Sequence, residues 1–285
     1  MSNSRFGNRT RTGNVQDWMV PGFINYDADA LNFINTAGIT DFTQRNAINF
    51  LTISFKNAGI WTKMTAMYPV IGGTADTHKF NLKNPADTDA AFRLIFSSGW
   101  THSSTGMLPG GSSHANTHLL PSTSMTNLNS HFSVYSRTNN STGTRTDIGT
   151  THTVAAGYSP LIALRARNST DQAESYFNDY IAITFAQGVN TDSRGFFLAN
   201  RTSNIVNQIW KNFNKLATNT TTETRSLTVI AKPVFLGAIN LDGAASQFSS
   251  RELAFASIGT SLTDTEATNM SQIVTAYQIL LNRNV

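Results

Sequence analysis

The spacing of apolar residues changes near residue 60. Before that point apolar positions recur at helical intervals, and Asp27 is placed to cap a short helix that ends at Gly38. Thr40 or Asp41 is placed to cap a second helix that ends at Gly59. The apolar positions that share one face of this second helix are Ala47, Ile48, Leu51 and Phe55. We therefore expect residues 23–60 to form a helical lead-in that packs on the body of the protein.

After residue 60 the chain consists of short runs of β-branched and aromatic residues, separated by Gly, Asn, Ser and Pro. The runs predicted as strands are 64–71, 78–82, 91–96, 131–137, 161–165, 180–185, 195–200, 205–210, 226–230, 235–239 and 253–258. No helical pattern of regular length lies between them, which favours an antiparallel β-sandwich over a parallel α/β sheet. We expect residues 61–285 to be one sandwich domain.

The end of the chain carries a capping box, in which Thr263 and Glu266 are placed to bond the free backbone N–H groups of a helix. The helix is predicted over 263–282. Its apolar stripe consists of Ala267, Met270, Ile273, Val274, Tyr277, Leu280 and Leu281. The helix must therefore lie against the sandwich or against a partner subunit. No repeat of fixed period is visible, which excludes solenoids and propellers.

Composition narrows the class of protein. Of 285 residues 40% are hydrophobic and only 13% are charged, while Thr, Asn and Ser number 38, 29 and 27. Such a mixture is typical of strands joined by many turns. The net charge of +4 comes from scattered Lys and Arg, which argues against a nucleic-acid protein. Without cysteine, neither disulfides nor thiolate metal sites contribute.

Residues 1–22 differ from the rest of the chain. Arg5, Arg9 and Arg11 lie among small polar residues, with no acidic residue before Asp17 and with Trp18 as the first large apolar group. This pattern predicts a flexible basic arm that anchors the protein to other proteins. The segment lacks the apolar core of a signal peptide, and no run of about 18 apolar residues follows. We expect a protein that is made in the cytoplasm and spans no membrane.

Catalytic patterns are missing from the sequence. Glycoside hydrolases need two carboxyl groups that flank the scissile glycosidic bond. Hydrolases with a β-sandwich fold place these groups at alternate positions of one strand. The glutamates, Glu174, Glu223, Glu252 and Glu266, are not arranged in this way. Phosphate loops, nucleophile–base pairs and dinucleotide fingerprints are also absent. We predict no catalytic residues, although carboxylates that are distant in sequence can still meet in space.

Metal-binding patterns are weak. His114 and His118 have the spacing of two ligands on a helix, but Gly, Ser and Pro around them predict a loop. The Asp-x-Asp pairs at 27–29 and 87–89 are more typical of helix caps and turns than of a calcium cage. We therefore predict neither a metal nor a cofactor.

Carbohydrate binding needs an aromatic platform and a few polar groups. Trp100, His102, Tyr135, Arg137 and Tyr158 are the candidates for this role. The alternative for Trp100 and Tyr135 is a place in the core or in a subunit contact.

Motifs along most of the chain resemble a family of virion proteins from tailed bacteriophages. These motifs are AGITD at 37–41, AGIWTKM at 58–64, HKFNLKNP at 78–85, DAAFRL at 89–94, GWTHS at 99–103, SRT at 136–138, RELAFASIG at 251–259 and LTDTEA at 262–267. The resemblance runs from residue 30 to the end and is looser over 139–195.

The resemblance implies a concanavalin A-like jelly roll, the sandwich of legume lectins, laminin G domains and some glucanases. It implies no single activity, since such proteins occur in phage heads, fibres and tails. Because catalytic patterns are missing, we expect a non-enzymatic structural protein on the virion surface, such as a head fibre, capsid, neck or tail component, which the arm attaches to other virion proteins. It also implies a homo-oligomer, for which we expect a trimer. The alternative is a receptor-binding lectin module of a tail fibre that recognises a host surface glycan; a glycoside hydrolase is a remote alternative.

Overall fold

The structure is a computed structural model that describes residues 25–126, 128–141, 145–153, 159–179, 184–222 and 230–285. The helices are α1 (Ala28–Thr36), α2 (Phe42–Asn57), η2 (Trp61–Lys63), α3 (Ala75–His78), η3 (Asp89–Ala91), α4 (Pro121–Ser124) and α5 (Asp264–Leu280). No helix in the described residues has the length and apolar character needed to cross a bilayer.

The strands of the described residues form two sheets. The strands are β1 (Met64–Tyr68), β2 (Ile95–Phe96), β3 (Thr101–His102), β4 (Met107–Leu108), β5 (Ala115–Asn116), β6 (Ser130–Ser136), β7 (Ile148–Thr151), β8 (Leu161–Arg165), β9 (Gln172–Asp179), β10 (Ala186–Val189), β11 (Gly195–Ser203), β12 (Val206–Lys211), β13 (Asn214–Asn219), β14 (Phe235–Leu236), β15 (Ile239–Leu241), β16 (Ala244–Ser246) and β17 (Leu253–Gly259).

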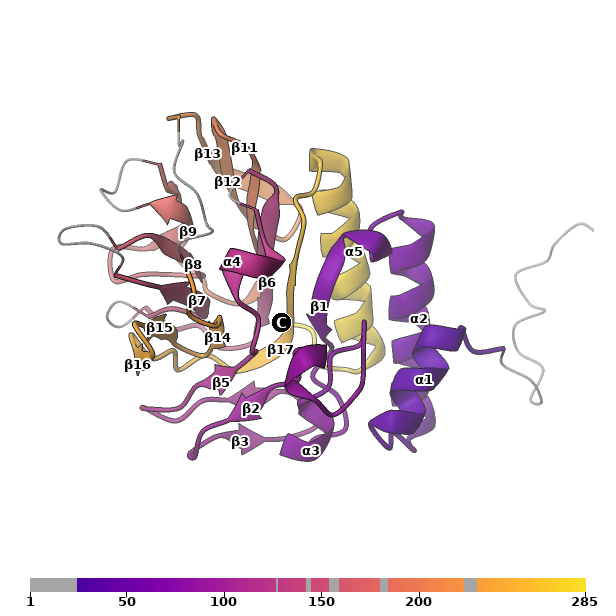
Figure 1. Ribbon diagram of the computed structural model, residues 1–285. Helices are drawn as coiled ribbons and strands as arrows, with labels where there is room; N and C mark the ends of the chain where they lie inside the picture. The colour runs from indigo at the N-terminus through magenta and orange to yellow at the C-terminus, as the bar shows by residue number, and fades with distance from the viewer. Residues whose placement is uncertain (1–24, 127, 142–144, 154–158, 180–183, 223–229) are drawn as a thin grey trace, which may run out of the picture.

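The first sheet has the order β13-β12-β11-β6-β17-β4-β3, with β1 paired to the second half of β17. The second has the order β10-β9-β8-β7-β14-β5-β2, with the β15–β16 hairpin attached to β7. All pairs are antiparallel except β7 with β15. The two sheets face each other as a sandwich (Figure 1). The prediction of a mainly β, antiparallel sandwich with short N-terminal helices and one C-terminal helix is confirmed.

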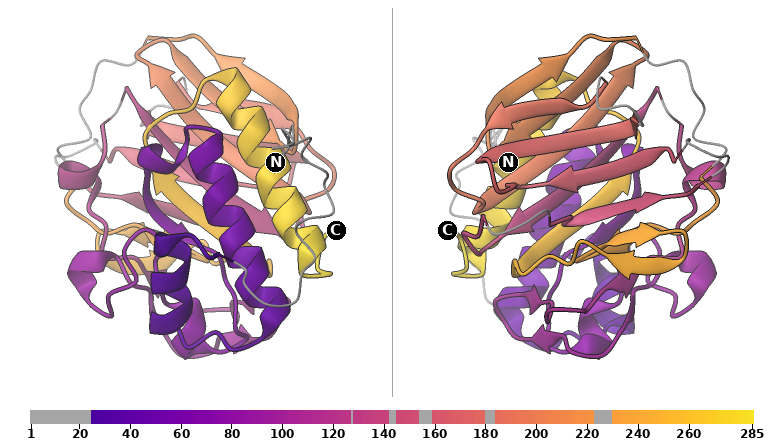
Figure 2. Two further views of the ribbon diagram at one scale, coloured as in Figure 1. Left: turned by 90° about the vertical axis from the view of Figure 1, so that its right-hand side faces the viewer. Right: turned by 90° about the vertical axis from the view of Figure 1, so that its left-hand side faces the viewer.

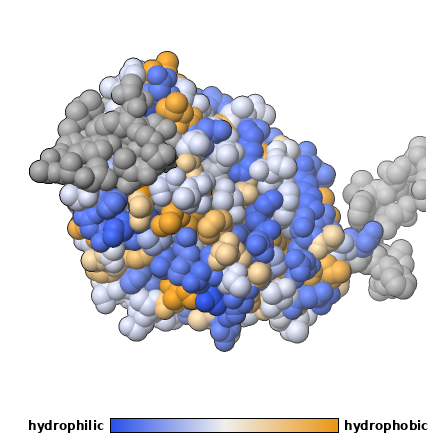
Figure 3. Space-filling model, in the orientation of Figure 1, coloured by the Kyte–Doolittle hydropathy of each residue, from blue (hydrophilic) through white to orange (hydrophobic). Residues whose placement is uncertain are grey.

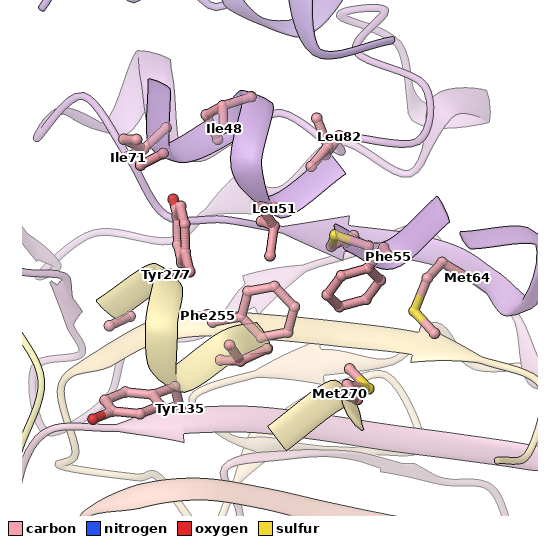
Figure 4. Packing of buried hydrophobic residues seen from close by; sticks show 14 of the residues in the cluster. Ile48, Leu51, Phe55, Met64, Ile71, Leu82, Tyr135, Phe255, Met270 and Tyr277 are labelled. Atoms are coloured by element: carbon pink, nitrogen blue, oxygen red, sulfur yellow. The ribbon is translucent and has the colours of Figure 1, made fainter. Parts of the chain in front are cut away.

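Two apolar cores lie on opposite faces of the first sheet. One fills the space between the sheets, where Phe132, Val134 and Phe197 meet Ile162 and Phe177. The other lies between the first sheet and the helices α1, α2 and α5, which cover its outer face in Figure 2. Figure 4 shows this second core from close by. Its labelled members are Ile48, Leu51, Phe55, Met64, Ile71, Leu82, Tyr135, Phe255, Met270 and Tyr277. The helices therefore belong to the same packed body as the sandwich.

The predicted helix starts and ends agree with the structure. Asp27 and Asp41 accept hydrogen bonds from the backbone N–H groups of Asp29 and Gln44, which caps α1 and α2. Thr263 and Glu266 form the expected capping box of α5. Leu280 was expected on the buried stripe of this helix, but it is 44% exposed, whereas Tyr277 and Gln278 in the same turn are fully buried.

Two strand predictions are wrong. Residues 78–82 form the end of α3 and a turn, because Thr74 caps a helical turn and the Asn81 side chain bonds the backbone of Met67. In the segment 91–96 only Ile95–Phe96 pairs, since Phe92 has left-handed backbone geometry. The segments 180–185 and 226–230 lie mostly outside the described residues, and their described parts are not strands.

Strands β7, β10 and β13 lie outside the predicted runs, and so does β9. It carries Glu174 among its alternating residues, and this glutamate forms an ion pair with Arg165 on the outer face of the second sheet, with 3.0 Å between Nη1 and Oε2. A charged residue on a strand weakens the apolar signal on which the prediction relied.

Candidate functional site

The hairpin of β3 and β4 lies at an edge of the first sheet. Thr101 pairs with Leu108, and His102 pairs with Met107. Directly opposed residues of an antiparallel pair point to the same face. Because Met107 is buried between the sheets, His102 also points to the side of the second sheet, where β2 forms the edge. The lower part of Figure 1 shows β2 and β3 next to each other.

Four rings gather at this edge, and we call them the edge cluster: His78, Phe96, Trp100 and His102. The ring of Phe96 lies edge-on to His102 at 4.6 Å and to Trp100 at 5.5 Å, measured between centroids. His78 lies 5.0 Å from His102 on the other side. His78 is buried, whereas Phe96, Trp100 and His102 are half-buried. The cluster therefore closes the sandwich edge, and three of its four residues keep part of their surface in contact with solvent.

The hydrogen bonds of the cluster determine the histidine tautomers. The backbone N–H of Gly73 donates to Nε2 of His78 at 3.2 Å, so the ring proton of neutral His78 is on Nδ1. That proton is donated to Nδ1 of His102 at 2.9 Å, which places the proton of His102 on Nε2. Among the described residues Nε2 of His102 has no partner, and it is not a buried atom. His102 therefore presents an N–H donor to solvent.

Both histidines are neutral near pH 7. Burial lowers the pKa of His78 to about 3, and the neighbouring His102 and Arg283 act in the same direction. Burial also lowers the pKa of His102. The donor at Nε2 of His102 consequently stays an uncharged imidazole over the physiological range.

Trp100 is held at both ends of its ring. Its indole N–H donates to the backbone oxygen of His114 at 3.0 Å. A Cβ atom at Gly237, whose φ is +75°, would lie 2.9 Å from the Trp100 ring, so only glycine leaves room for it. The orientation of the Trp100 ring is therefore fixed, and its N–H is already used.

A polar pocket of about 330 Å³ lies at the tip of the same hairpin, and we call it the hairpin pocket. The start of α2, the end of α5 and the loop after β1 enclose it. Its lining residues are Asp41, Thr43, Gln44, Ile71, Ser104, Thr105, Leu281 and Asn282. Gly73 lies between the pocket and the edge cluster: it donates to His78, and a Cβ at Gly73 would be 3.2 Å from the backbone N of Ser104. The two features thus share one loop and one hairpin.

Arg137 contacts the pocket lining indirectly, through Glu252. Its Nη1 donates to Oε2 of Glu252 at 2.6 Å, and its Nε donates to the backbone oxygen of Arg283 at 2.8 Å. Oε1 of Glu252 accepts a hydrogen bond of 2.6 Å from the hydroxyl of Thr105, which lines the pocket. The Arg137 side chain is only 17% exposed, so it positions the hairpin tip through Glu252.

The other sequence candidates lie elsewhere. Tyr135 is 1% exposed and packs under α5, where its hydroxyl donates to Asn284 at 2.8 Å; Figure 4 shows it on its strand below the helix. Tyr135 therefore occupies the core, as the alternative interpretation had it, and does not reach the site. Tyr158 lies outside the described residues, and so do the arm residues Arg5, Arg9, Arg11 and Trp18.

The acidic residues that were considered for catalysis or metal binding have local partners. Glu174, Glu252 and Glu266 form ion pairs with Arg165, Arg137 and Lys63, and Glu223 lies outside the described residues. Asp27 caps α1, while Asp87 and Asp89 contact Arg93.

The two histidines with helical spacing are separated by the strand β5. His114 stacks on Phe235 at 4.4 Å between centroids, and His118 lies 3.6 Å from Asp89. Groups of three or more metal-ligating side chains do not occur within the described ranges.

Sequence analysis identified Trp100, His102 and Arg137 but missed the residues that line the pocket. Gln44, Ser104, Thr105 and Asn282 come from three distant segments that only the folded chain brings together. The role of His78 was also missed. The adjacent glycines Gly72 and Gly73 were the available signal, because a glycine pair before a capped helical turn suggests a close backbone approach.

No family model matches the chain. No curated protein matches it either. Among solved structures, domain 4 of AbnA, a GH43 extracellular arabinanase from Geobacillus stearothermophilus in complex with arabinotriose, is 13% identical with a TM-score of 0.47. That match covers 74% of this chain and 98% of the other. The Ruminococcus gnavus IT-sialidase CBM40 bound to alpha2,3 sialyllactose is 11% identical with a TM-score of 0.41, over 48% and 79% of the two chains. Likenesses this weak identify neither a family nor a ligand.

Proposed function

We propose that this protein is a lectin-type, non-catalytic glycan-binding protein and that the edge cluster with the hairpin pocket is its binding surface. The observation that carries the proposal is the set of partly exposed aromatic residues, Phe96, Trp100 and His102, beside the solvent-facing N–H of His102. The C–H faces of sugars pack on aromatic rings, and their hydroxyls bond to a few oriented polar groups. Both elements occur here at one edge of the sandwich.

We propose a non-catalytic role because each of the described glutamates is held in an ion pair. Each of Glu174, Glu252 and Glu266 accepts a charge-assisted hydrogen bond from Arg or Lys at 3.0 Å or less. A catalytic carboxyl group must be free to contact the bond that it cleaves, whereas these carboxylates are held by their cationic partners. An ion pair of this kind suits a structural role better than acid catalysis.

The test is a binding measurement on the full chain. A panel of immobilised glycans identifies a ligand, and calorimetry then compares the parent protein with Trp100→Ala and His102→Ala. We expect the dissociation constant to rise at least about 10-fold for Trp100→Ala, since removal of a stacked aromatic removes most of its contact area. Phe213→Ala is the matched control, because Phe213 is 48% exposed but lies at the β12–β13 turn. Failure of the parent chain to bind any glycan would contradict the proposal.

We also propose that the protein belongs to the surface of a tailed-phage particle, which it joins through residues 1–22. The support for this setting is the set of sequence motifs from AGITD at 37–41 to LTDTEA at 262–267. Localisation in purified particles by cryo-electron microscopy tests it. Density at a fibre tip with a free hairpin fits host adhesion, density on a capsid, neck or tail ring with the hairpin covered fits architecture alone, and absence from particles contradicts the setting.

A purely architectural role is the second candidate function, and one observation favours it. Phe42 at the start of α2 is 64% exposed, and Ile279 and Leu280 at the end of α5 are 56% and 44% exposed. These helix ends meet at the hairpin pocket, so a neighbouring subunit could cover them. On the face shown in Figure 3, in contrast, apolar residues are interspersed with polar ones. Light scattering of the purified chain tests the proposed trimer: a monomer at micromolar concentration would contradict it.

A further inference from the structure

We propose that the hairpin pocket is a subsite for an uncharged sugar residue, and that it discriminates against sugars that carry carboxylate, sulfate or phosphate. This inference rests on the proposed glycan-binding function and names its ligand class. Pocket size is the first argument. A volume of about 330 Å³ lies at the lower end of the range of about 300–1,000 Å³ that small-molecule sites occupy. It has room for a mono- or disaccharide.

Hydrogen-bonding chemistry is the second argument. The lining contains the hydroxyls of Thr43, Ser104 and Thr105 and the side-chain amides of Gln44 and Asn282. Hydroxyls and amides both donate and accept hydrogen bonds, as the hydroxyls of a sugar do. Ser104 is exposed and Gln44 is half-buried, and the hydrogen bonds of the described residues leave both side chains without an intramolecular partner. A ligand with several hydroxyl groups therefore finds free partners on two sides of the pocket.

The charge of the lining is the third argument. Asp41 is the ionisable lining residue, and its Oδ1 caps α2 by accepting from the backbone N–H of Gln44 at 2.8 Å. The capping carboxylate thus occupies the helix start where an anion could otherwise bind. A ligand carboxylate would meet a like charge within the pocket, which is unfavourable at short range.

Nearby cations do not compensate for this charge. Arg137 donates to Glu252, and the guanidinium of Arg45 lies over the ring of Tyr26 at 5.2 Å. Arg283 is 1% exposed. Its donors go to backbone oxygens of Pro69, Val70 and Ala254 and to the side chain of Gln278. An acidic sugar would therefore lose its hydration without gaining a countercharge.

The pocket and the edge cluster suit a single oligosaccharide. Ser104 follows His102 by two residues, so at most about 7 Å separates their Cα atoms, and Ser104 lies in the bend at the hairpin tip. An oligosaccharide with one residue on the rings and the next in the pocket would bridge this distance. The proposed ligand is accordingly an uncharged oligosaccharide whose terminal residue enters the pocket.

Calorimetric titrations with a neutral oligosaccharide from the glycan panel, and with the same oligosaccharide carrying a terminal carboxylate sugar, provide the test. We expect the parent chain to bind the neutral form at least about 10-fold more tightly. Gln44→Ala and Ser104→Ala should each raise the dissociation constant for the neutral form about 3- to 10-fold, as expected for one lost hydrogen bond. Ser112→Ala is the control, because Ser112 is equally exposed but does not line the pocket.

An introduced positive charge provides a second test. Ser104→Lys places a cation at the pocket and should improve binding of the carboxylate form relative to the neutral form, whereas Ser112→Lys should not. Binding that depends on Trp100 but prefers the acidic form, or that ignores the Gln44 and Ser104 changes, overturns this inference and leaves the proposed function standing. If Trp100→Ala does not weaken binding, the proposed function fails first.

Discussion

The guanidinium of Arg251 donates two hydrogen bonds to the carboxylate of Asp147, at 3.0 and 2.9 Å, and both side chains are fully shielded from solvent. The same carboxylate accepts from the Ser249 hydroxyl and from the backbone N–H of Ala166, each at 2.7 Å. This ion pair therefore joins the start of β7, the end of β8 and the segment before β17.

We predict that Asp147→Ala lowers the free energy of unfolding by about 3–5 kcal/mol, because it leaves the guanidinium of Arg251 buried without its countercharge. Urea denaturation measures the change. Asp192→Asn, at a solvent-exposed pair with Arg194, is the control and should leave the midpoint unchanged within error. A small effect of Asp147→Ala would mean that water enters the site.

The stability of the fold should fall in mild acid. Burial lowers the pKa of His131 to about 4, and its ring donates from Nδ1 to the backbone oxygen of Thr260 and accepts at Nε2 from Ser257. Since the pKa in the unfolded chain is about 6.5, the unfolded state binds a proton first as the pH falls. Stability is therefore retained above about pH 6.5 and declines between about 6.5 and 4.

Urea midpoints from pH 7.5 to 4.5 check this dependence. The buried His78, with a pKa lowered to about 3, contributes in the same direction. His131→Gln removes one titrating group and should flatten the profile, although it lowers stability at neutral pH. An unchanged slope in this variant would assign the acid sensitivity to other groups.

Tyr135→Phe separates a core role from a ligand role. The variant loses the hydroxyl hydrogen bond to Asn284 at 2.8 Å, which we expect to reduce stability by about 1 kcal/mol. Glycan affinity should be unchanged, because Tyr135 lies under α5 and away from the hairpin. If glycan affinity fell by more than the loss of stability can explain, Tyr135 would instead be part of the binding site.

The capping box of α5 predicts another stability effect. Thr263→Ala removes the hydroxyl that accepts from the backbone N–H of Glu266, and it should cost about 1 kcal/mol. Thr265→Ala is the matched control, since Thr265 is exposed in the same turn. Equal effects of the two changes would show that helix propensity, and not capping, decides the stability of this turn.

Removal of residues 1–20 tests the role of the arm. We expect the truncated protein to fold with an unchanged thermal midpoint, since the two cores of the described chain are built from residue 30 onward. Incorporation into particles should be abolished, as measured by mass spectrometry of purified virions. Unfolding of the truncated protein would instead make the arm part of the core.

Local signals in the sequence were sufficient for the elements whose ends depend on neighbouring residues. Asp27, Asp41 and Thr263 predicted three helix starts because a cap bonds the backbone only two or three residues away. The apolar runs of β6, β11 and β17 predicted strands, and these strands lie in the middle of the first sheet, where both faces are covered. The absence of helices between these runs predicted the sandwich itself.

Contacts between segments that are distant in sequence decided how the candidate site is assembled. The pairing of His78 with His102, the approach of Gly73 to Ser104 and the link from Thr105 to Glu252 join residues that carry no common local pattern. Sequence therefore determined which residues were suited to a sugar site, such as Trp100 and His102. Only the tertiary structure decided that these two share a surface and that Tyr135 lies in the core, because burial depends on what packs over a residue and not on its type.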